Sequence, residues 1–227
     1  MYNCGLVLEG GGTRAIYTSG VLDAFIENDI DFDYVIGVSA GSCNGASFIA
    51  KSLRRQHDIT IDYVNDKRYM SVESLIKHGE FLNCEWIFDE LSYDLMPINM
   101  NNYKKSKTPL IAVLTNAQTA KAEYVEVDDI ETRGCWPLHA SCALPIATRG
   151  VENEGKLYYD GGIVDSIPSK RAIDDGCKKQ VVILTQCAGY VKQPMKVKKV
   201  VNAVFKKEYP QLAEAIINRH IMYNQQL

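Results

Sequence analysis

The sequence has no long apolar run. No stretch approaches the roughly 18 apolar residues that a membrane helix needs. The N-terminal segment MYNCG has neither the basic start nor the apolar centre of a secretory signal. We therefore expect a cytoplasmic protein, with a peripheral contact on the inner membrane face left open. The formal net charge is only -3, so nucleic acid is not expected as a partner.

Patterns for metals, disulfides and nucleotides are also missing. The seven cysteines include no C-x-x-C pair, so we expect no zinc site and no disulfide framework. We expect no other metal and no organic cofactor. The glycine run at 10–12 is not followed by G-K-[ST], which excludes a Walker loop, and its spacing differs from G-x-G-x-x-G. A nucleotide-binding module stays open only as a lesser alternative.

The apolar pattern predicts strands that alternate with helices. Residues 3–9 and 32–38 are typical of buried strands, and each is followed by a helical pattern, at 13–28 and 39–53. Further strands are predicted at 109–116, 122–127 and 180–187, a hairpin turn at 152–155 leading to residues 158–160, and a last helix at 211–227. This alternation predicts an α/β fold, a three-layer sandwich with a mostly parallel central sheet covered by helices.

The length of 227 residues suits one large core, so we expect a single domain over residues 1–227. The last helical pattern has no terminator, which leaves an extension beyond residue 227 open. Residues 54–107 form a less regular helical excursion, with helices expected at 72–78 and 84–92. Its apolar residues suit a lid or the wall of an apolar groove, although such spacing more often belongs to a plain core. They are Phe81, Trp86, Ile87, Phe88, Leu91, Tyr93, Leu95 and Met96.

The first candidate for chemistry is a serine at the end of a predicted strand. Residues 37–41 read GVSAG, the nucleophile-elbow pattern, with Ser39 between Gly37 and Gly41. The two glycines relieve crowding in a sharp turn that lifts the serine hydroxyl above the sheet. The alternative is a tight turn whose serine only caps the helix. Cys43 is expected inside that helix as a packing residue rather than as a second nucleophile.

A serine nucleophile needs a base, and no histidine is well placed for that role. In α/β-hydrolases the histidine follows the acid, and only His220, in a polar helical tail, lies beyond the candidate acid. Asp160 is the better candidate, because it ends an aromatic strand and precedes Gly161 and Gly162. An exposed aspartate is a poor base, so Asp160 has to be buried and close to Ser39. The alternative is an ordinary Asp-Gly turn.

A glycine run marks the start of the first predicted helix. Gly10, Gly11 and Gly12 present consecutive backbone amides there, which is the geometry that binds an oxyanion or a phosphate. Arg14, one turn into the helix, is expected to hold the loop or to meet an anionic group of the substrate. The sequence leaves these two uses of Arg14 open.

Together these segments resemble the patatin-like phospholipases, which are serine acyl hydrolases with a Ser-Asp dyad and no catalytic histidine. The resemblance extends from Leu6 to Pro168 and is closest to small bacterial, intracellular members. It depends on four segments: 9–14 (EGGGTR), 37–41 (GVSAG), 140–145 (ASCALP) and 160–168 (DGGIVDSIP). Three positions depart from the family pattern: Ala15 replaces a frequent glycine, and Asp165 and Ser166 replace the commoner asparagines.

The resemblance implies a role for each matched residue. Ser39 would be the nucleophile, Asp160 the general base and Gly10 to Gly12 the oxyanion hole. The implied reaction is cleavage of fatty-acyl esters of phospholipids or related lipids through an acyl-enzyme, without a cofactor. Two alternatives stay open: a general carboxylesterase on soluble esters, and a non-catalytic lipid-binding regulator. Chain-length preference distinguishes the first, and a damaged dyad would indicate the second.

A basic stretch precedes the last predicted helix, and its lysines alternate with valines. We interpret it as the solvated face of an ordinary helix, because Phe205 is its only aromatic residue. Contact with anionic lipid headgroups is the open alternative. The lysines are Lys192, Lys196, Lys198, Lys199, Lys206 and Lys207. The sequence carries no signal of the oligomeric state.

Overall fold

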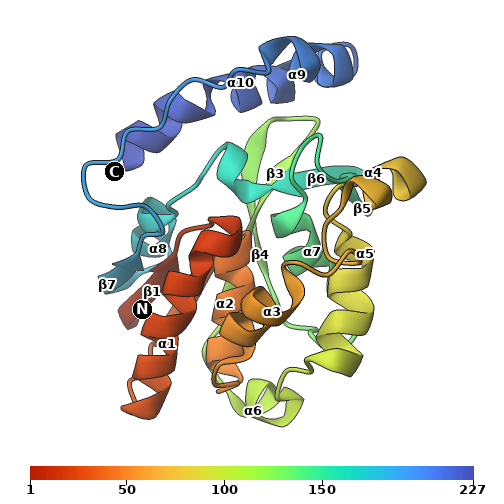
Figure 1. Ribbon diagram of the computed structural model, residues 1–227. Helices are drawn as coiled ribbons and strands as arrows, with labels where there is room; N and C mark the ends of the chain where they lie inside the picture. Colours follow the sequence, from red (N-terminus) through yellow and green to blue (C-terminus); the bar gives the residue numbers. More distant parts are fainter.

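A mixed sheet of seven strands forms the centre of the molecule, with helices on both faces (Figure 1). The computed structural model describes the backbone of residues 1–227 and the side chains of all except residues 77 and 78. The strands are β1 (Tyr2–Leu8), β2 (Tyr34–Val38), β3 (Leu110–Asn116), β4 (Lys121–Glu126), β5 (Val151–Asn153), β6 (Lys156–Asp160) and β7 (Cys177–Ile183). The predicted α/β sandwich is confirmed.

Helices and helical turns connect these strands. Those of the N-terminal half are η1 (Gly12–Ala15), α1 (Ile16–Glu27), α2 (Ala40–Ile49), α3 (Arg55–Tyr63), α4 (Val72–His78), α5 (Cys84–Trp86), η2 (Ile87–Leu95) and α6 (Met100–Lys105). The remainder are α7 (Trp136–Cys142), η3 (Gly161–Ile163), α8 (Ser169–Asp174), α9 (Lys198–Phe205) and α10 (Pro210–Gln226). Helices α9 and α10 lie together beyond one end of the sheet (Figure 1).

Strand β3 organises the sheet, because three other strands pair with it. The strand order is β5-β6-β3-β2-β1-β7, and β4 pairs with β3 as well. Strands β1, β2, β3 and β7 are parallel, whereas β4 and β6 run antiparallel to β3. β4 and the β5–β6 hairpin therefore account for the mixed direction of the sheet.

Along the inner strands, successive apolar side chains pack on opposite faces of the sheet, so each face has its own part of the core. Leu6, Leu8 and Val35 pack into the cluster that includes residues of α1 and α2. Val7 and Ile36, their neighbours along the strands, pack on the opposite face with residues of α8 and α10. This period of two follows from the pleat of a strand that is covered on both sides. Helix α2 is thus held tightly against the sheet at the point where β2 ends.

Two predicted elements differ from the structure. The last predicted strand, 180–187, is β7 and ends at Ile183, because its partner β1 ends at Leu8, the residue paired with Ile183. The helix predicted over 84–92 is a short α-helix followed by a π-helix. Its wider winding appears in the bond from the Met96 N–H to the Leu91 carbonyl, five residues back. Among the described residues, no helix is both long and apolar enough to cross a membrane.

Candidate active site

Ser39 occupies a strained position between β2 and α2. Its φ is 55° and its ψ is -130°, in a region that residues with a side chain rarely adopt. A Cβ on Gly37 would lie 2.6 Å from the Ser42 nitrogen, and one on Gly41 would lie 2.5 Å from the Leu8 carbonyl oxygen. Only glycine fits at these two positions, so the chain turns sharply at Ser39. Strain of this kind is typical of functional turns.

Strand β3 brings Ser39 and Asp160 together. Val38, the last residue of β2, pairs with Val113 of β3, and Asp160, the last residue of β6, pairs with Leu114. Both partners lie on the edge of β3 opposite β4, because β4 pairs with the same stretch from the other side. The ends of β2 and β6 therefore meet at consecutive positions along one strand.

Asp160 is a buried carboxyl group. The residue is 2 % exposed, and its Oδ1 accepts a 2.8 Å hydrogen bond from the Gly162 N–H. Burial raises the pKa of Asp160, while Arg219, the Ser39 hydroxyl and the Gly162 N–H oppose that rise. Among the described residues, the Ser39 hydroxyl and the Asp160 carboxylate do not form a well-aligned hydrogen bond. Catalytic pairs often align fully only when substrate is bound.

The glycines after Asp160 permit two close approaches. A Cβ on Gly161 would lie only 2.1 Å from the carbonyl oxygen of Val113, so the chain turns directly against β3. A Cβ on Gly162 would lie 2.7 Å from Nη2 of Arg219 and 3.0 Å from Oδ1 of Asp160. Gly162 therefore leaves room for Arg219 beside the carboxylate.

The ASCALP segment fixes both candidate residues. The Ser141 hydroxyl accepts a 2.9 Å bond from the Ser39 N–H and donates a 2.8 Å bond to the Val113 carbonyl. The Asp160 N–H donates to the Ala143 carbonyl at 2.8 Å. One short segment, at the end of α7, thus ties the backbones of Ser39 and Asp160 to the same part of β3.

The glycine run lies beside Ser39 with its amides free. A Cβ on Gly10 would lie 3.0 Å from the Ser39 Cβ, so this loop approaches the serine closely. Among the hydrogen bonds of the described residues, the N–H groups of Gly10, Gly11 and Gly12 donate to no protein acceptor. Free amides next to a strained serine are the arrangement that an oxyanion hole requires.

A buried glutamate that sequence reasoning left without a role holds this loop. Glu9 is 3 % exposed, and its carboxylate accepts bonds from the Thr185 N–H at 2.5 Å and the Tyr223 hydroxyl at 2.6 Å. The Thr185 hydroxyl also donates to the Gly10 carbonyl at 2.8 Å. The only indication of this role in the sequence was an acidic residue directly after a predicted buried strand. The partners come from the loop after β7 and from α10, which are far away along the chain.

Helix α10 supplies further contacts that the sequence did not indicate. Arg219 acts on the Asp160 carboxyl, and its Nε is buried without a hydrogen-bond partner among the described atoms. The Gln226 side chain accepts bonds from the N–H groups of Ser166 and Ile167, each at 3.0 Å, and donates to Asp165 at 2.7 Å. The residues that replace the family's asparagines are therefore held by the C-terminal helix.

Arg14 and the histidine His139 have no described contact with Ser39 or Asp160. Arg14 is exposed on η1, and its charge acts on Lys192, whose pKa is lowered to about 8 by burial, Arg219 and Arg14. His139 stacks on Phe88 at 5.2 Å, and burial lowers its pKa, as expected for a structural residue. The side chain of His78 lies outside the described residues. In the described part of the chain, no three His, Cys, Asp or Glu side chains group as metal ligands.

Ser39 lines an apolar cavity of about 130 Å³. It is bounded by α2 on one side and by the excursion on the other, where Ile87, Phe88 and Leu91 of η2 contribute to its wall. Cys43 also lines it, with its sulfur 3.7 Å from that of Cys142. The cavity has the apolar lining that a hydrocarbon chain prefers.

Comparison with known proteins agrees with this architecture. The family model described as patatin-like phospholipase matches residues 6–173. The uncharacterized protein YjjU of Escherichia coli (strain K12) is 31% identical over 188 residues, which are 79% of this chain and 51% of YjjU. The crystal structure of VipD from Legionella pneumophila covers 93% of this chain and 55% of VipD, with a TM-score of 0.50 and 15% identity.

The chain thus spans about half the length of these two relatives. The likeness to VipD concerns the fold, whereas the family match covers the glycine run, Ser39 and Asp160 but not the contacts from α10. The predicted resemblance is confirmed: the chain belongs to the patatin-like phospholipase family.

Proposed function

We propose that this protein is a serine acyl hydrolase that cleaves fatty-acyl ester bonds of phospholipids or related lipids. Ser39 is the nucleophile and Asp160 is the general base. The observation that carries the proposal is the meeting of the two residues at consecutive positions along β3, with Ser39 strained and Asp160 buried. Family membership supports an activity on lipid esters.

In the first half of the reaction, Asp160 takes the proton of the Ser39 hydroxyl as Oγ attacks the ester carbonyl. Burial favours this role, because a raised pKa makes the carboxylate a stronger base than an exposed aspartate. The amides of Gly10 to Gly12 donate to the oxygen of the tetrahedral intermediate, and loss of one such donor typically costs about 10²- to 10³-fold in rate. The alcohol leaves with the proton from Asp160.

In the second half, Asp160 takes a proton from water, whose oxygen attacks the acyl-serine. Collapse of this second intermediate releases the fatty acid and returns the proton to Ser39. The acyl chain occupies the cavity between α2 and the excursion, so we assign residues 54–107 to the acyl groove rather than to a lid. We propose a single domain over residues 1–227, acting in the cytoplasm on lipid at the inner membrane face.

Chain-length preference tests the lipid assignment. We expect kcat/KM for para-nitrophenyl esters to rise from acetate towards octanoate and decanoate, because each added methylene is buried in the apolar cavity, at roughly 0.8 kcal/mol. Fatty-acid release from phospholipid and lysophospholipid vesicles is measured in parallel. A preference for acetate, without release from vesicles, would indicate a general carboxylesterase. Lipid binding without turnover of any ester would indicate a non-catalytic lipid-binding protein.

Arg219 is expected to set the pH dependence of the base. Its charge lowers the pKa of Asp160, so Arg219→Gln lets that pKa rise further. Because the base acts when deprotonated, the acid limb of kcat/KM moves to higher pH in the variant. Arg171→Gln is the control, since Arg171 pairs with Asp175 at 2.8 Å and is not among the groups that act on Asp160. An unmoved acid limb in Arg219→Gln contradicts this role.

A membrane contact is proposed for the surface around α9. Val201 and Phe205 pack inside, while Val197, Val200 and Val204 are exposed beside exposed lysines. An apolar stripe flanked by lysines suits the surface of an anionic bilayer. The exposed lysines are Lys196, Lys198, Lys199, Lys206 and Lys207.

Vesicle binding tests this surface. We expect Lys198→Glu with Lys199→Glu to weaken binding to phosphatidylglycerol vesicles by roughly tenfold or more, since each lysine near the surface contributes about 1 kcal/mol. The matched control is Lys178→Glu with Lys179→Glu, which reverses two exposed lysines on β7. Equal loss in both pairs would mean that only net charge matters, and unchanged binding in the first pair would exclude a contact through α9.

A further inference from the structure

The cavity lined by Ser39 follows one face of helix α2. Ala40, Cys43 and Asn44 line it at helical spacing, followed by Ala46. Near the far end of α2 the wall becomes polar, because Arg55 and Gln56 of α3 contribute to it. The cavity thus begins at the proposed nucleophile and reaches a cationic group.

Arg55 is a buried cation with hydrogen-bonding capacity to spare. The residue is 9 % exposed, its Nε donates to the Met96 carbonyl at 2.6 Å, and its Nη1 donates to the Ser47 hydroxyl at 3.0 Å. A guanidinium carries five N–H groups. Among the described hydrogen bonds, three of these five have no acceptor, and the residue lines the cavity.

No carboxylate of the described residues pairs with Arg55. The groups that act on its charge are the Cys43 thiol and the Tyr93 hydroxyl. Burial lowers the pKa of Arg55 to about 10, which leaves the guanidinium charged at neutral pH. A buried guanidinium without a carboxylate beside it is costly, and such groups are normally paired. The protein bears this cost at a position where a bound molecule can supply the missing anion.

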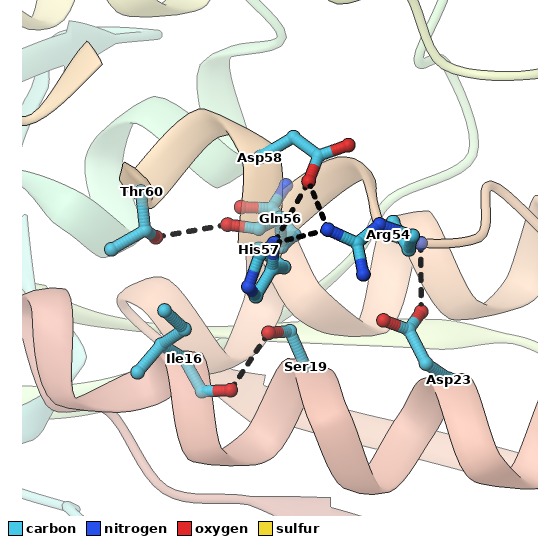
Figure 2. A network of polar contacts seen from close by, with 8 residues as sticks. All are labelled: Ile16, Ser19, Asp23, Arg54, Gln56, His57, Asp58 and Thr60. Atoms are coloured by element: carbon cyan, nitrogen blue, oxygen red, sulfur yellow. Dashed lines mark hydrogen bonds and ion pairs between the residues drawn. The ribbon is translucent and has the colours of Figure 1, made fainter. Parts of the chain in front are cut away.

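The preceding arginine shows the contrast. Arg54 is exposed at the N-terminal end of α3, where its guanidinium contacts Asp58 at 3.1 Å and His57 at 3.2 Å (Figure 2). Its backbone N–H donates to Asp23 of α1 at 2.9 Å. Of two arginines next to each other in the sequence, the exposed one therefore has an acid partner, and the buried one has none among the described residues.

We propose that Arg55 binds an acidic group at the far end of the acyl chain, so that the enzyme prefers esters whose acyl chain ends in a carboxylate. This inference rests on the proposed function, because it takes the acyl chain to run from Ser39 along the cavity. Ser47, which bonds Arg55, is eight residues beyond Ser39, or about 12 Å along the helix axis. At roughly 1.2 Å per bond, an extended chain of about ten carbons spans that distance.

Two esters of equal length test the proposal: para-nitrophenyl decanoate and the mono-para-nitrophenyl ester of decanedioic acid. We expect wild type to have the higher kcat/KM for the acid-terminated ester, through a lower KM. Arg55→Met is expected to lower kcat/KM for that ester by roughly tenfold to a hundredfold, the usual range for a lost hydrogen bond to a charged group. The ratio of kcat/KM for the acid-terminated ester to kcat/KM for decanoate should therefore fall by roughly tenfold or more in Arg55→Met, and Arg55→Lys should retain part of the preference.

Arg54→Met is the matched control, because it removes an adjacent cation outside the cavity. It is expected to leave the ratio of the two kcat/KM values unchanged. If Arg55→Met fails to fold, wild type and Arg55→Lys still decide the question. Equal kcat/KM for both esters in wild type, or a preference that survives in Arg55→Met, overturns the proposal. Failure to hydrolyse either ester counts against the proposed function instead.

Discussion

Ser39→Ala is expected to abolish ester hydrolysis, with kcat lowered by roughly 10⁴-fold or more, the scale seen when a serine nucleophile is removed. The reason is structural as well as chemical. The strained turn between β2 and α2 presents only this side chain to the loop of Gly10 and to Asp160. Release of para-nitrophenol from the octanoate ester measures the loss, and circular dichroism checks that the variant folds.

Cys43 provides the sharpest control for this experiment. It lies one turn further along α2, lines the same cavity, and its pKa is lowered by a hydrogen bond with Cys142. A thiol with a lowered pKa is a rival nucleophile. We expect Cys43→Ala to retain most of the activity. The reverse result, with activity kept in Ser39→Ala and lost in Cys43→Ala, would assign the reaction to the thiol.

Asp160→Asn is expected to lower kcat by roughly 10³-fold or more while making the protein more stable at neutral pH. The activity falls because an amide cannot take the proton of Ser39. The stability rises because asparagine keeps an oxygen that accepts the Gly162 N–H, yet removes a charge that burial disfavours. Loss of activity together with gain of stability is typical of a residue kept for function.

The pH dependence of that gain follows from the direction of the pKa shift. The pKa of Asp160 is raised in the folded state, so the folded protein binds the proton more tightly than the unfolded chain does. The carboxyl therefore costs wild type stability as the pH rises through that raised pKa. Asp160→Asn lacks this cost. Its advantage in free energy of unfolding should be absent at low pH and fully developed above the folded pKa.

Denaturant unfolding at several pH values measures this advantage, and Asp165→Asn is the control. Asp165 is also buried with a raised pKa, but it bonds Tyr124 and Gln226 rather than facing Ser39. We expect it to keep most of the activity. If Asp160→Asn retained activity near that of Asp165→Asn, Asp160 would not be the base.

The sequence predicted the parts of the site that depend on local backbone. Gly37, Gly41 and Gly161 are needed because backbone atoms approach within 3 Å of where a Cβ would be, and each lies in a turn from a strand into a helix or helical turn. Such crowding arises within a few residues of the turn. Short motifs therefore predict it, and the structure has crowded turns at the glycines of the predicted elbow and of the Asp-Gly-Gly motif, while their part in catalysis stays a prediction.

The contacts from the C-terminal helix could not be predicted in this way. Arg219 and Tyr223 reach Asp160 and Glu9 across more than fifty residues of sequence, on a helix whose pattern is ordinary. Nothing local distinguishes them from surface residues of the same helix. Arg55 is a similar case, since its lack of an acid partner is visible only once α3 is packed against α2.

Labelling with a fluorophosphonate tests the central claim most directly, because this probe reports an activated serine without requiring the natural substrate. Wild type should be labelled, and peptide mapping should place the label on Ser39. Ser39→Ala should not react, and Asp160→Asn should react far more slowly, since its serine lacks a base. Labelling of Ser39→Ala at the wild-type rate, or a label on another residue, would contradict the account.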